Sequence, residues 1–490
     1  MGRLSDITSK KYLAAVPPLI AFAGAVVSAK ATSMSMLIAG SILIGVTLST
    51  ISIAQAIPSE VLPLKYRALA QGLCGMAGTI GGLVGSLGGG AVTNVASDGW
   101  RWIFWMQAIF HGITSVGFFL FYWPRANTEY PNITLKEIVW ICDPIGSVLF
   151  ILGATLTLLA MDWASGTYDG SDPHIVAPLT IGLVILAAFC AYEWKGRADG
   201  LVAHVFFRRN ANFALAVFAY AVEGWIFYSA VNSVVPQIVL YLGWEDDSWD
   251  ISVRQLSFQL VIFFTPILLS WYATRFKDLK SPLLVTWISF LAVSIFYSCV
   301  KPSLDKGQIV INVVGGFGQA GPLTLLPAVI QYTAPHAFLS TATGLAFSAR
   351  AIGGAFGSAV LDAIINGRIN AHYASAVSGA AIDAGLPQSS VEALLEAIAN
   401  SLTRESVPGA TEDVWNAALD ASHNEYAHAF RLAWASVIPF VVLALIALAF
   451  LKGVKELMTE KVEATVEKLK VELDEDTEKG VGSKIAEMHL

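Results

Sequence analysis

The chain is 490 residues long, with 55% hydrophobic residues, only 14% charged residues and a formal net charge of −7. Its mean hydropathy is +0.61. A soluble domain could not bury this much apolar surface, so the composition excludes a soluble protein and indicates one whose surface faces the lipid bilayer.

Twelve apolar stretches approach the roughly 20 residues that cross a bilayer as an α-helix. Several contain Gly or Pro, which membrane-spanning helices tolerate. The sequence therefore predicts an all-α, polytopic membrane protein. The predicted spans lie near residues 12–29, 34–57, 72–96, 102–123, 144–162, 175–194, 212–241, 254–273, 282–300, 307–332, 341–366 and 429–451.

The basic residues predict the orientation of the spans. Lys and Arg gather in alternate connections, at residues 3–11, 65–67, 125–136, 195–209 and 275–280. The positive-inside bias makes these connections cytoplasmic. We therefore expect a multi-pass plasma-membrane protein with both termini in the cytoplasm. The one glycosylation sequon, at Asn132, falls in such a connection and is expected to carry no glycan.

Two segments of the chain repeat each other. Residues 63–86 match residues 335–358 at a fixed offset of 272, and the matched positions include Pro63 with Pro335 and Gly85 with Gly357. Such a repeat in membrane-like sequence indicates a duplicated transporter half.

The position of the repeat divides the chain. If the second copy lies in the fifth helix of a six-span half, that half covers residues 211–451. The first copy is then preceded by only two spans, so residues 1–123 form an incomplete four-span half. Residues 124–210 add a two-span insert with a cytoplasmic connection, and residues 452–490 form a cytoplasmic tail.

Several motifs resemble those of a known family. Residues 2–6, GRLSD, followed by Lys10 and Lys11, resemble the G-x-L-x-D-basic loop of the major facilitator superfamily, and residues 81–90 resemble its antiporter motif. More narrowly, five segments resemble the fungal fourteen-span transporters grouped around the trichothecene efflux pumps. They are residues 63–67, 100–105, 350–354, 425–431 and 457–462.

The resemblance implies a two-half helical bundle with twelve of fourteen spans present and two absent from the front. It implies alternating access, driven by the proton gradient, that exports hydrophobic toxins, drugs or secondary metabolites. One alternative is proton-coupled uptake of ferric siderophores, which a related fungal group performs. Another is a truncated, non-transporting membrane protein or sensor. The resemblance also implies a gating role for the motif residues, which include Gly2, Asp6, Lys10 and Lys11.

Glu223 is the first candidate for a proton or substrate site. It lies midway along the span 212–241, where an ionised carboxylate is costly and usually faces a bundle interior or an aqueous cavity. A protonated or hydrogen-bonded structural Glu is the alternative. Aromatic residues surround it in sequence and suit an apolar substrate cavity, although lipid contact explains half of them equally well. The further candidates here are Tyr220, Trp225, Phe227 and Tyr228, with Gln237 and Gln331 as weaker polar ones.

Three other intramembrane residues could serve transport. Arg350 and Asp362 share one predicted span, twelve residues apart, near one helix face but too distant for a direct pair. They could act in gating or form structural pairs near the cytoplasmic surface. His111 is the only His within a predicted span. Its imidazole could relay protons, or it could simply be hydrogen-bonded.

Two sets of glycines predict close helix packing. Small residues on a helix face let backbones approach each other in the membrane. We expect these sets to form a seam between the two halves that opens and closes during transport. They are Gly81, Gly82, Gly85, Gly89, Gly90, Gly353, Gly354 and Gly357.

Two segments are predicted to lie outside the membrane. Residues 367–428 read as a polar extracellular connection, either lid-like or structural, in which Ser389 and Ser390 cap an amphipathic helix over 391–400. From Lys452 onward the tail reads as an amphipathic helix at the cytoplasmic membrane surface, followed by a disordered end.

The sequence gives no support to an enzyme. It contains no P-loop, so ATP-driven transport has no basis here. Paired carboxylates, a metal-ligand cluster and a nucleophile elbow are also missing. We therefore expect no cofactor, no bound metal and no nucleic-acid partner, and a monomer whose partners are the bilayer, protons and a small hydrophobic molecule or siderophore.

Overall fold

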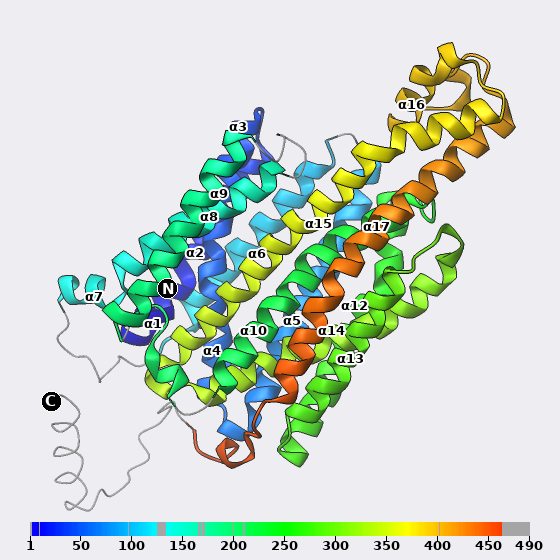
Figure 1. Cartoon of the computed structure of the whole chain (residues 1–490). Helices are drawn as coiled ribbons and strands as arrows, with labels where there is room; N and C mark the ends of the chain where they lie inside the picture. Colours follow the sequence, from blue (N-terminus) through cyan, green and yellow to red (C-terminus); the bar gives the residue numbers. More distant parts are fainter. Residues whose placement is uncertain are drawn as a thin grey trace, which may run out of the picture.

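The computed structural model describes residues 2–462 except positions 9, 97, 125–133, 165–167, 169–171, 199, 209–210 and 401. Every regular element over these residues is helical. The long helices run side by side as one bundle, and two of them, α15 and α17, extend beyond it with α16 at their tip (Figure 1).

Among the described residues, twelve helical segments are long and apolar enough to cross a membrane, which confirms the predicted number and order of spans. The first six are Lys10–Ala29 (α2), Met34–Val61 (α3, η1 and α4), Leu64–Val95 (η2 and α5), Trp100–Phe121 (α6), Pro144–Ala164 (α8) and Pro173–Gly196 (α9 and η3). The second six are Asn212–Tyr241 (α10, η5 and α11), Ser248–Phe276 (α12), Lys280–Tyr297 (α13), Pro302–Thr333 (η6 and α14), His336–Asp383 (η7 and α15) and Glu412–Ala449 (α17). Shorter helices are α1 (Gly2–Ile7), α7 (Leu135–Ile141), η4 (His204–Phe207) and α16 (Val391–Ala399).

The two copies of the internal repeat adopt the same local structure. Pro63 and Pro335 each precede a 3-10 turn, η2 (Leu64–Tyr66) and η7 (His336–Phe338). The long helices α5 (Arg67–Val95) and α15 (Leu339–Asp383) follow at once. A proline suits this place because its fixed φ does not continue a preceding helix and its missing N–H is not needed there. The helix starts therefore keep the offset seen in the sequence.

The largest apolar core holds the last six spans together. All of its members come from residues 203–458, except Ala68 of α5. Large aromatic side chains fill it: Trp434 stacks on Tyr297 with 4.6 Å between ring centroids, and the buried Trp287 donates its indole N–H to the Val441 carbonyl at 2.9 Å. These contacts fix α13 against α17 and hold the helices that carry the site described below.

Buried carboxylates anchor the spans α8 and α9. Asp143 accepts hydrogen bonds from the Gly146 amide at 3.0 Å and the Tyr192 hydroxyl at 3.1 Å. Glu193 accepts one from the Val202 amide at 2.9 Å. These bonds join the ends of α8 and α9 to the connection that leads into α10 (Asn212–Gly224).

The polar connection predicted over 367–428 is mostly helical, with more helix than the one segment expected at 391–400. Helix α15 continues to Asp383 and α17 begins at Glu412, so both extend past their apolar portions. They continue because buried residues on their facing sides, including Val377 and Val414, pack with α16 in a second apolar cluster. Figure 1 shows this extension at the end of the bundle.

Details of the two outer segments also differ from the predictions. Helix α16 forms at Val391–Ala399 as predicted, but its N-cap Ser390 makes no side-chain cap hydrogen bond and a 3-10 turn, Gln388–Ser390, precedes it. In the tail, the described part ends at Val462 and contains only the 3-10 turn Lys455–Leu457 rather than the start of an α-helix. The rest of the tail and Asn132 lie outside the described residues.

Candidate functional site

Glu223 of α10 and Arg350 of α15 form an ion pair inside the bundle. Glu223 is fully buried and Arg350 is 5% exposed. The Arg350 Nη2 donates to Glu223 Oε1 at 2.9 Å, while Nε donates to Oε2. Gln319 of α14 (Asp305–Thr333) adds a third donor to Oε1. Such bidentate, charge-assisted contacts fix the position of the carboxylate.

The ion pair lies deep within its helices. Glu223 and Arg350 each lie about 16 Å along their helices from the first residue, at about 1.5 Å per residue. The hydrocarbon core of a bilayer is about 30 Å thick. The distance of about 16 Å is about half of that thickness.

Aromatic rings surround the arginine. Its Nη1 donates to the Tyr228 hydroxyl at 2.6 Å, and the guanidinium carbon lies 5.4, 5.0 and 4.6 Å from the ring centroids of Tyr220, Phe227 and Tyr228. Cation–π attraction is stronger in such a dry environment than at a surface. The Tyr220 hydroxyl and Gln319 Oε1 have no hydrogen-bond partner among the described residues. The predicted aromatic cluster therefore contacts the partner of Glu223.

A close helix crossing brings the pair together. A Cβ on Gly224 would collide with the Arg350 backbone, and a Cβ on Gly353 would collide with the carbonyl of Ala221. Directly after Gly224 the chain forms a π-helical segment, η5 (Trp225–Val234). π-Helical turns are rare and often mark functional sites. Gly354 and Gly357 pack on Tyr228 and Trp225 of this segment.

The predicted loop motif at the N-terminus holds the start of α15. The Asp6 carboxylate accepts hydrogen bonds from the Ser340 amide at 3.1 Å and from the Thr341 amide and hydroxyl at 2.9 and 2.6 Å. A Cβ on Gly2 would lie 2.5 Å from the Ser340 carbonyl oxygen, so only glycine fits. Arg3 lies over the Phe338 ring at 4.0 Å. We call these contacts the N-terminal latch.

Burial affects the chemistry of this latch. Because Asp6 is largely removed from water, its pKa is raised above the ordinary 3.8, against the opposing effect of the hydrogen bonds from Thr341 and Ser340. The two motif lysines act elsewhere: Lys10 forms an ion pair with Glu60 of α4 (Ile51–Val61), and Lys11 lies over the Trp123 ring at 2.7 Å. Gly2 and Asp6 of the motif therefore belong to the N-terminal latch, and Lys10 and Lys11 hold α2 in place.

A buried polar cluster connects four helices at the end of the bundle where the N-terminal latch lies. The Gln71 amide of α5 donates to Gln331 Oε1 of α14 at 3.1 Å, and Gln331 Nε2 donates to the Thr343 hydroxyl of α15 at 3.2 Å. Gln71 also donates to the Gln55 carbonyl of α4 at 2.9 Å. These four residues, which we call the polar clasp, connect the N-terminal spans to α14 and α15.

Helix α5 meets α12 (Ser248–Phe276) along a seam of small residues. A Cβ on Gly72 would lie 2.6 Å from the Ser270 hydroxyl oxygen, and one on Gly90 would lie 2.6 Å from that of Ser252. The seam is therefore carried by the two ends of α5. Gly81, Gly82 and Gly85 have no atom within 4 Å of an added Cβ, and Gly353, Gly354 and Gly357 pack within residues 211–451. The expectation that all these glycines line one seam is wrong.

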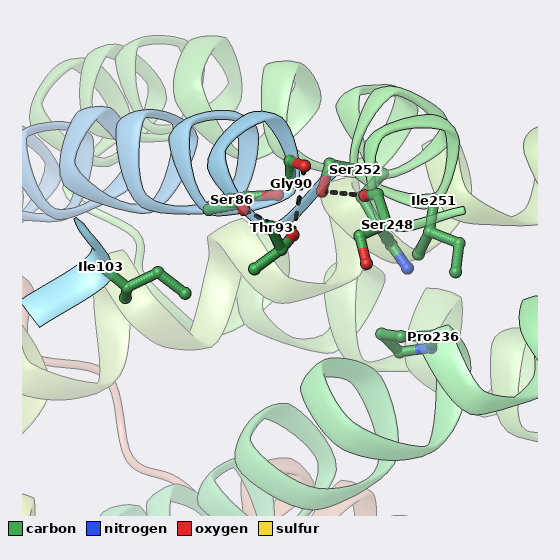
Figure 2. A pocket seen from close by; sticks show the side chains of 10 residues that line it. Ser86, Gly90, Thr93, Ile103, Pro236, Ser248, Ile251 and Ser252 are labelled. Carbon is green, nitrogen blue, oxygen red and sulfur yellow. Dashed lines mark hydrogen bonds between the residues drawn. The ribbon is translucent and has the colours of Figure 1, made fainter. Parts of the chain in front are cut away.

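A cavity opens between α5 and α12 at the end of the bundle opposite the N-terminal latch. Its volume is about 360 Å³. Figure 2 shows Ser86 and Thr93 of α5 facing Ser248 and Ser252 of α12, with Ile103 and Pro236 on either side. The remaining lining residues are Gly89, Gly90, Ile251 and Gln255. We call this the α5–α12 cavity.

The remaining predicted site residues lie apart from the ion pair. Asp362 lies about three turns beyond Arg350, near Asp162 of α8. His111 is half-buried on α6. Gln237 donates to the Ser233 hydroxyl at 3.3 Å. Trp225 packs against Phe440 at 4.4 Å between centroids, away from the guanidinium.

Sequence reasoning missed three residues of these clusters. Gln319 contacts Glu223, Gln71 joins the polar clasp, and Gln255 lines the cavity. A useful signal was available for each of them, because an amide side chain inside an apolar span is expensive to bury without a partner. The partners of these side chains, however, depend on which helices pack together in the fold.

Comparison with known proteins identifies the family. The model of the Major Facilitator Superfamily matches residues 1–358. The chain belongs to this superfamily. Among curated superfamily members, a transporter of Penicillium rubens is 28% identical over 459 residues, covering 90% of this chain and 81% of the relative. The trichothecene efflux pump of Fusarium sporotrichioides is 24% identical over 462 residues, covering 90% of this chain and 75% of the pump.

Solved structures of the superfamily are less similar to this chain. The structure of a proton:xylose symporter is 13% identical, with a TM-score of 0.48, and the match covers 95% of this chain and 87% of that one. As a superfamily member with twelve candidate spans, this protein is a multi-pass membrane transporter and not an enzyme.

Proposed function

We propose that this transporter exports uncharged hydrophobic metabolites across the plasma membrane in exchange for protons, by alternating access between two halves. The export direction is supported by its similarity to the Fusarium efflux pump. The observation that carries the proposal is the asymmetry of the seam: the N-terminal latch and the polar clasp close one end, and the α5–α12 cavity opens at the other. With both termini cytoplasmic, this is an outward-facing state.

The Glu223–Arg350 pair is the proposed site of proton coupling. Ionisable groups deep in a membrane are costly and occur where ions or protons move. A proton on Glu223 would remove the negative charge that holds the guanidinium, so Arg350 would have to leave or find another partner. The Tyr220 hydroxyl and Gln319 Oε1 lie beside the pair and have no hydrogen-bond partner within the described part of the chain. They offer polar positions for a proton-carrying water. Protonation would thus move α10 relative to α15.

A flux assay in proteoliposomes tests this function. The full chain is reconstituted, and entry of a tritiated trichothecene is followed with the interior more acidic than the exterior. Proton exchange predicts that the acid interior accelerates entry and that Glu223→Gln abolishes this dependence on the pH gradient. Gln237→Leu, which loses only a weak bond to Ser233, should retain it.

Other results would exclude the proposal in distinct ways. Gradient-driven flux that is unchanged in Glu223→Gln would remove Glu223 from the coupling mechanism. Movement of a radioiron ferric siderophore together with protons, without trichothecene flux, would support siderophore uptake instead. Flux of neither probe above empty liposomes would leave a membrane protein that does not transport.

A further inference from the structure

The lining of the α5–α12 cavity carries no formal charge. Its polar groups are the hydroxyls of Ser86, Thr93, Ser248 and Ser252 and the carboxamide of Gln255, and the other lining residues are Gly, Ile and Pro. Two hydroxyls are already used as donors, since Thr93 bonds to the Gly89 carbonyl at 2.8 Å and Ser252 to that of Ser248 at 2.7 Å. An ionic ligand would lose its hydration here without gaining a counter-charge.

The positively charged Arg254 lies next to Gln255 on α12, but it does not make the cavity suitable for an ionic ligand. Arg254 donates to Glu245 at 2.8 Å and to Gln308 at 2.7 Å, so its guanidinium is held on another face of the helix. The cavity volume of about 360 Å³ lies near the lower end of the range for small-molecule sites, which is roughly 300–1,000 Å³. The cavity therefore suits a compact neutral molecule or one segment of a larger molecule.

Gln255 has an unused hydrogen-bonding group at this cavity. Its side chain is 9% exposed, and its Nε2 has no partner among the described residues. Leaving a buried amide donor without a partner is costly. This nitrogen is buried, so the Gln255 side chain must turn toward the cavity to present it. A ligand oxygen would then satisfy it, while the Ile103, Ile251 and Pro236 side chains would contact the apolar part of the same molecule.

We propose that the α5–α12 cavity is a binding subsite for an uncharged, mainly apolar molecule that presents a carbonyl or ether oxygen to Gln255. The subsite rests on the transport function proposed above and adds to it a place and a ligand chemistry. It lies between the last turns of α5 and the first turns of α12, whose separation must change if the seam opens and closes.

The glycines of α5 create the space for this ligand. Gly90 lets α5 touch α12, because an added Cβ would lie 2.6 Å from the Ser252 hydroxyl oxygen. Gly89 is different, since its Cβ would meet only the end of the Ile103 side chain, at 3.7 Å. A large side chain at Gly89 would therefore fill the cavity, and the seam contact at Gly90 would remain.

Photolabelling with benzophenone tests the subsite directly. This probe is neutral and apolar, carries one carbonyl oxygen and attaches to nearby C–H groups under ultraviolet light. The full chain in lipid nanodiscs is labelled, and the modified residues are located by mass spectrometry. We expect saturable labelling at Ile103, Pro236 and Ile251 that is weaker for the anion 4-benzoylbenzoate.

Two variants and one control examine the chemistry. Gln255→Leu removes the donor at nearly constant volume and should weaken benzophenone binding about 5–10-fold, as for loss of one hydrogen bond. Gly89→Leu should reduce cavity labelling to that of lipid-facing peptides. Gln259→Leu, one turn further along α12 and outside the cavity lining, should label as the unmodified chain does.

The outcomes separate the subsite from the transport function. Cavity labelling that is not saturable, or that is equal in all variants, would overturn the subsite even if trichothecene flux is observed. Labelling that follows Gln255 and Gly89 in a protein without flux would retain the subsite and reject the transport proposal. Equal labelling by the neutral and anionic probes would refute the ligand class.

Discussion

At the residue scale, Glu223 is held by a partner that lies 127 positions away in the chain. The sequence predicts that a carboxylate in an apolar span needs a partner or a proton, but it does not say which. The structure supplies Arg350 and Gln319 because α10 and α15 cross at two glycines. Glu223 was predictable as a candidate, while the ion pair depends on the crossing.

Removing one member of this pair should destabilise the protein strongly. Glu223→Gln leaves the Arg350 guanidinium buried without a counter-charge, and breaking a buried pair in this way costs about 3–5 kcal/mol. We expect a clearly lower thermal midpoint in detergent. The double variant Glu223→Gln with Arg350→Met should recover much of the loss, because no charge remains buried. A single variant as stable as the parent would show that the pair is not desolvated.

The raised pKa of Asp6 gives the N-terminal latch a defined pH dependence. A carboxyl group whose pKa is higher in the latched state binds its proton more tightly there, so protonation favours that state. The stabilisation is complete below the ordinary pKa of 3.8 and is lost as the pH rises through the raised value.

Hydrogen exchange can measure this effect. The Ser340 and Thr341 amides, which donate to Asp6, should become more protected as the pH falls from 7 toward 4, after correction for intrinsic exchange. Asp6→Asn should show no such trend. Protection that decreases on acidification of the unmodified chain would contradict the assignment.

At the element scale, apolar length and internal repetition were sufficient to predict the spans, because crossing a bilayer requires long apolar helices. The continuation of α15 to Asp383 and of α17 from Glu412 was not predictable in this way. Outside the membrane only one helix face is apolar, and a mixed sequence of this kind resembles a loop. Packing with α16 makes it helical.

The glycines of the two repeat copies should respond differently to the same substitution. Gly353→Ala places a Cβ against the Ala221 carbonyl and should destabilise by about 1–3 kcal/mol through overpacking. Gly85→Ala places a Cβ in open space and should stabilise by about 0.5–1 kcal/mol through helix propensity. Denaturation of both variants in detergent measures the difference. Effects of equal sign would contradict the packing.

At the scale of the whole molecule, two kinds of contact separate the ends of the bundle. The N-terminal latch and the polar clasp unite distant segments at one end, and the α5–α12 cavity lies at the other. The motif resemblance indicated which residues belong to the latch. Their partners at Ser340 and Thr341 required the fold, since no local pattern specifies contacts between positions more than 330 residues apart.

The proposed transport cycle requires the latched end of the bundle to open. A cleavable bis-maleimide joining Arg3→Cys to Ala337→Cys, with Cys74, Cys142, Cys190 and Cys299 replaced by Ser, tests it by flux in proteoliposomes. We expect flux before cross-linking, loss of flux in the cross-linked protein and recovery when the linker is cleaved. Undiminished flux through fully cross-linked protein would contradict it.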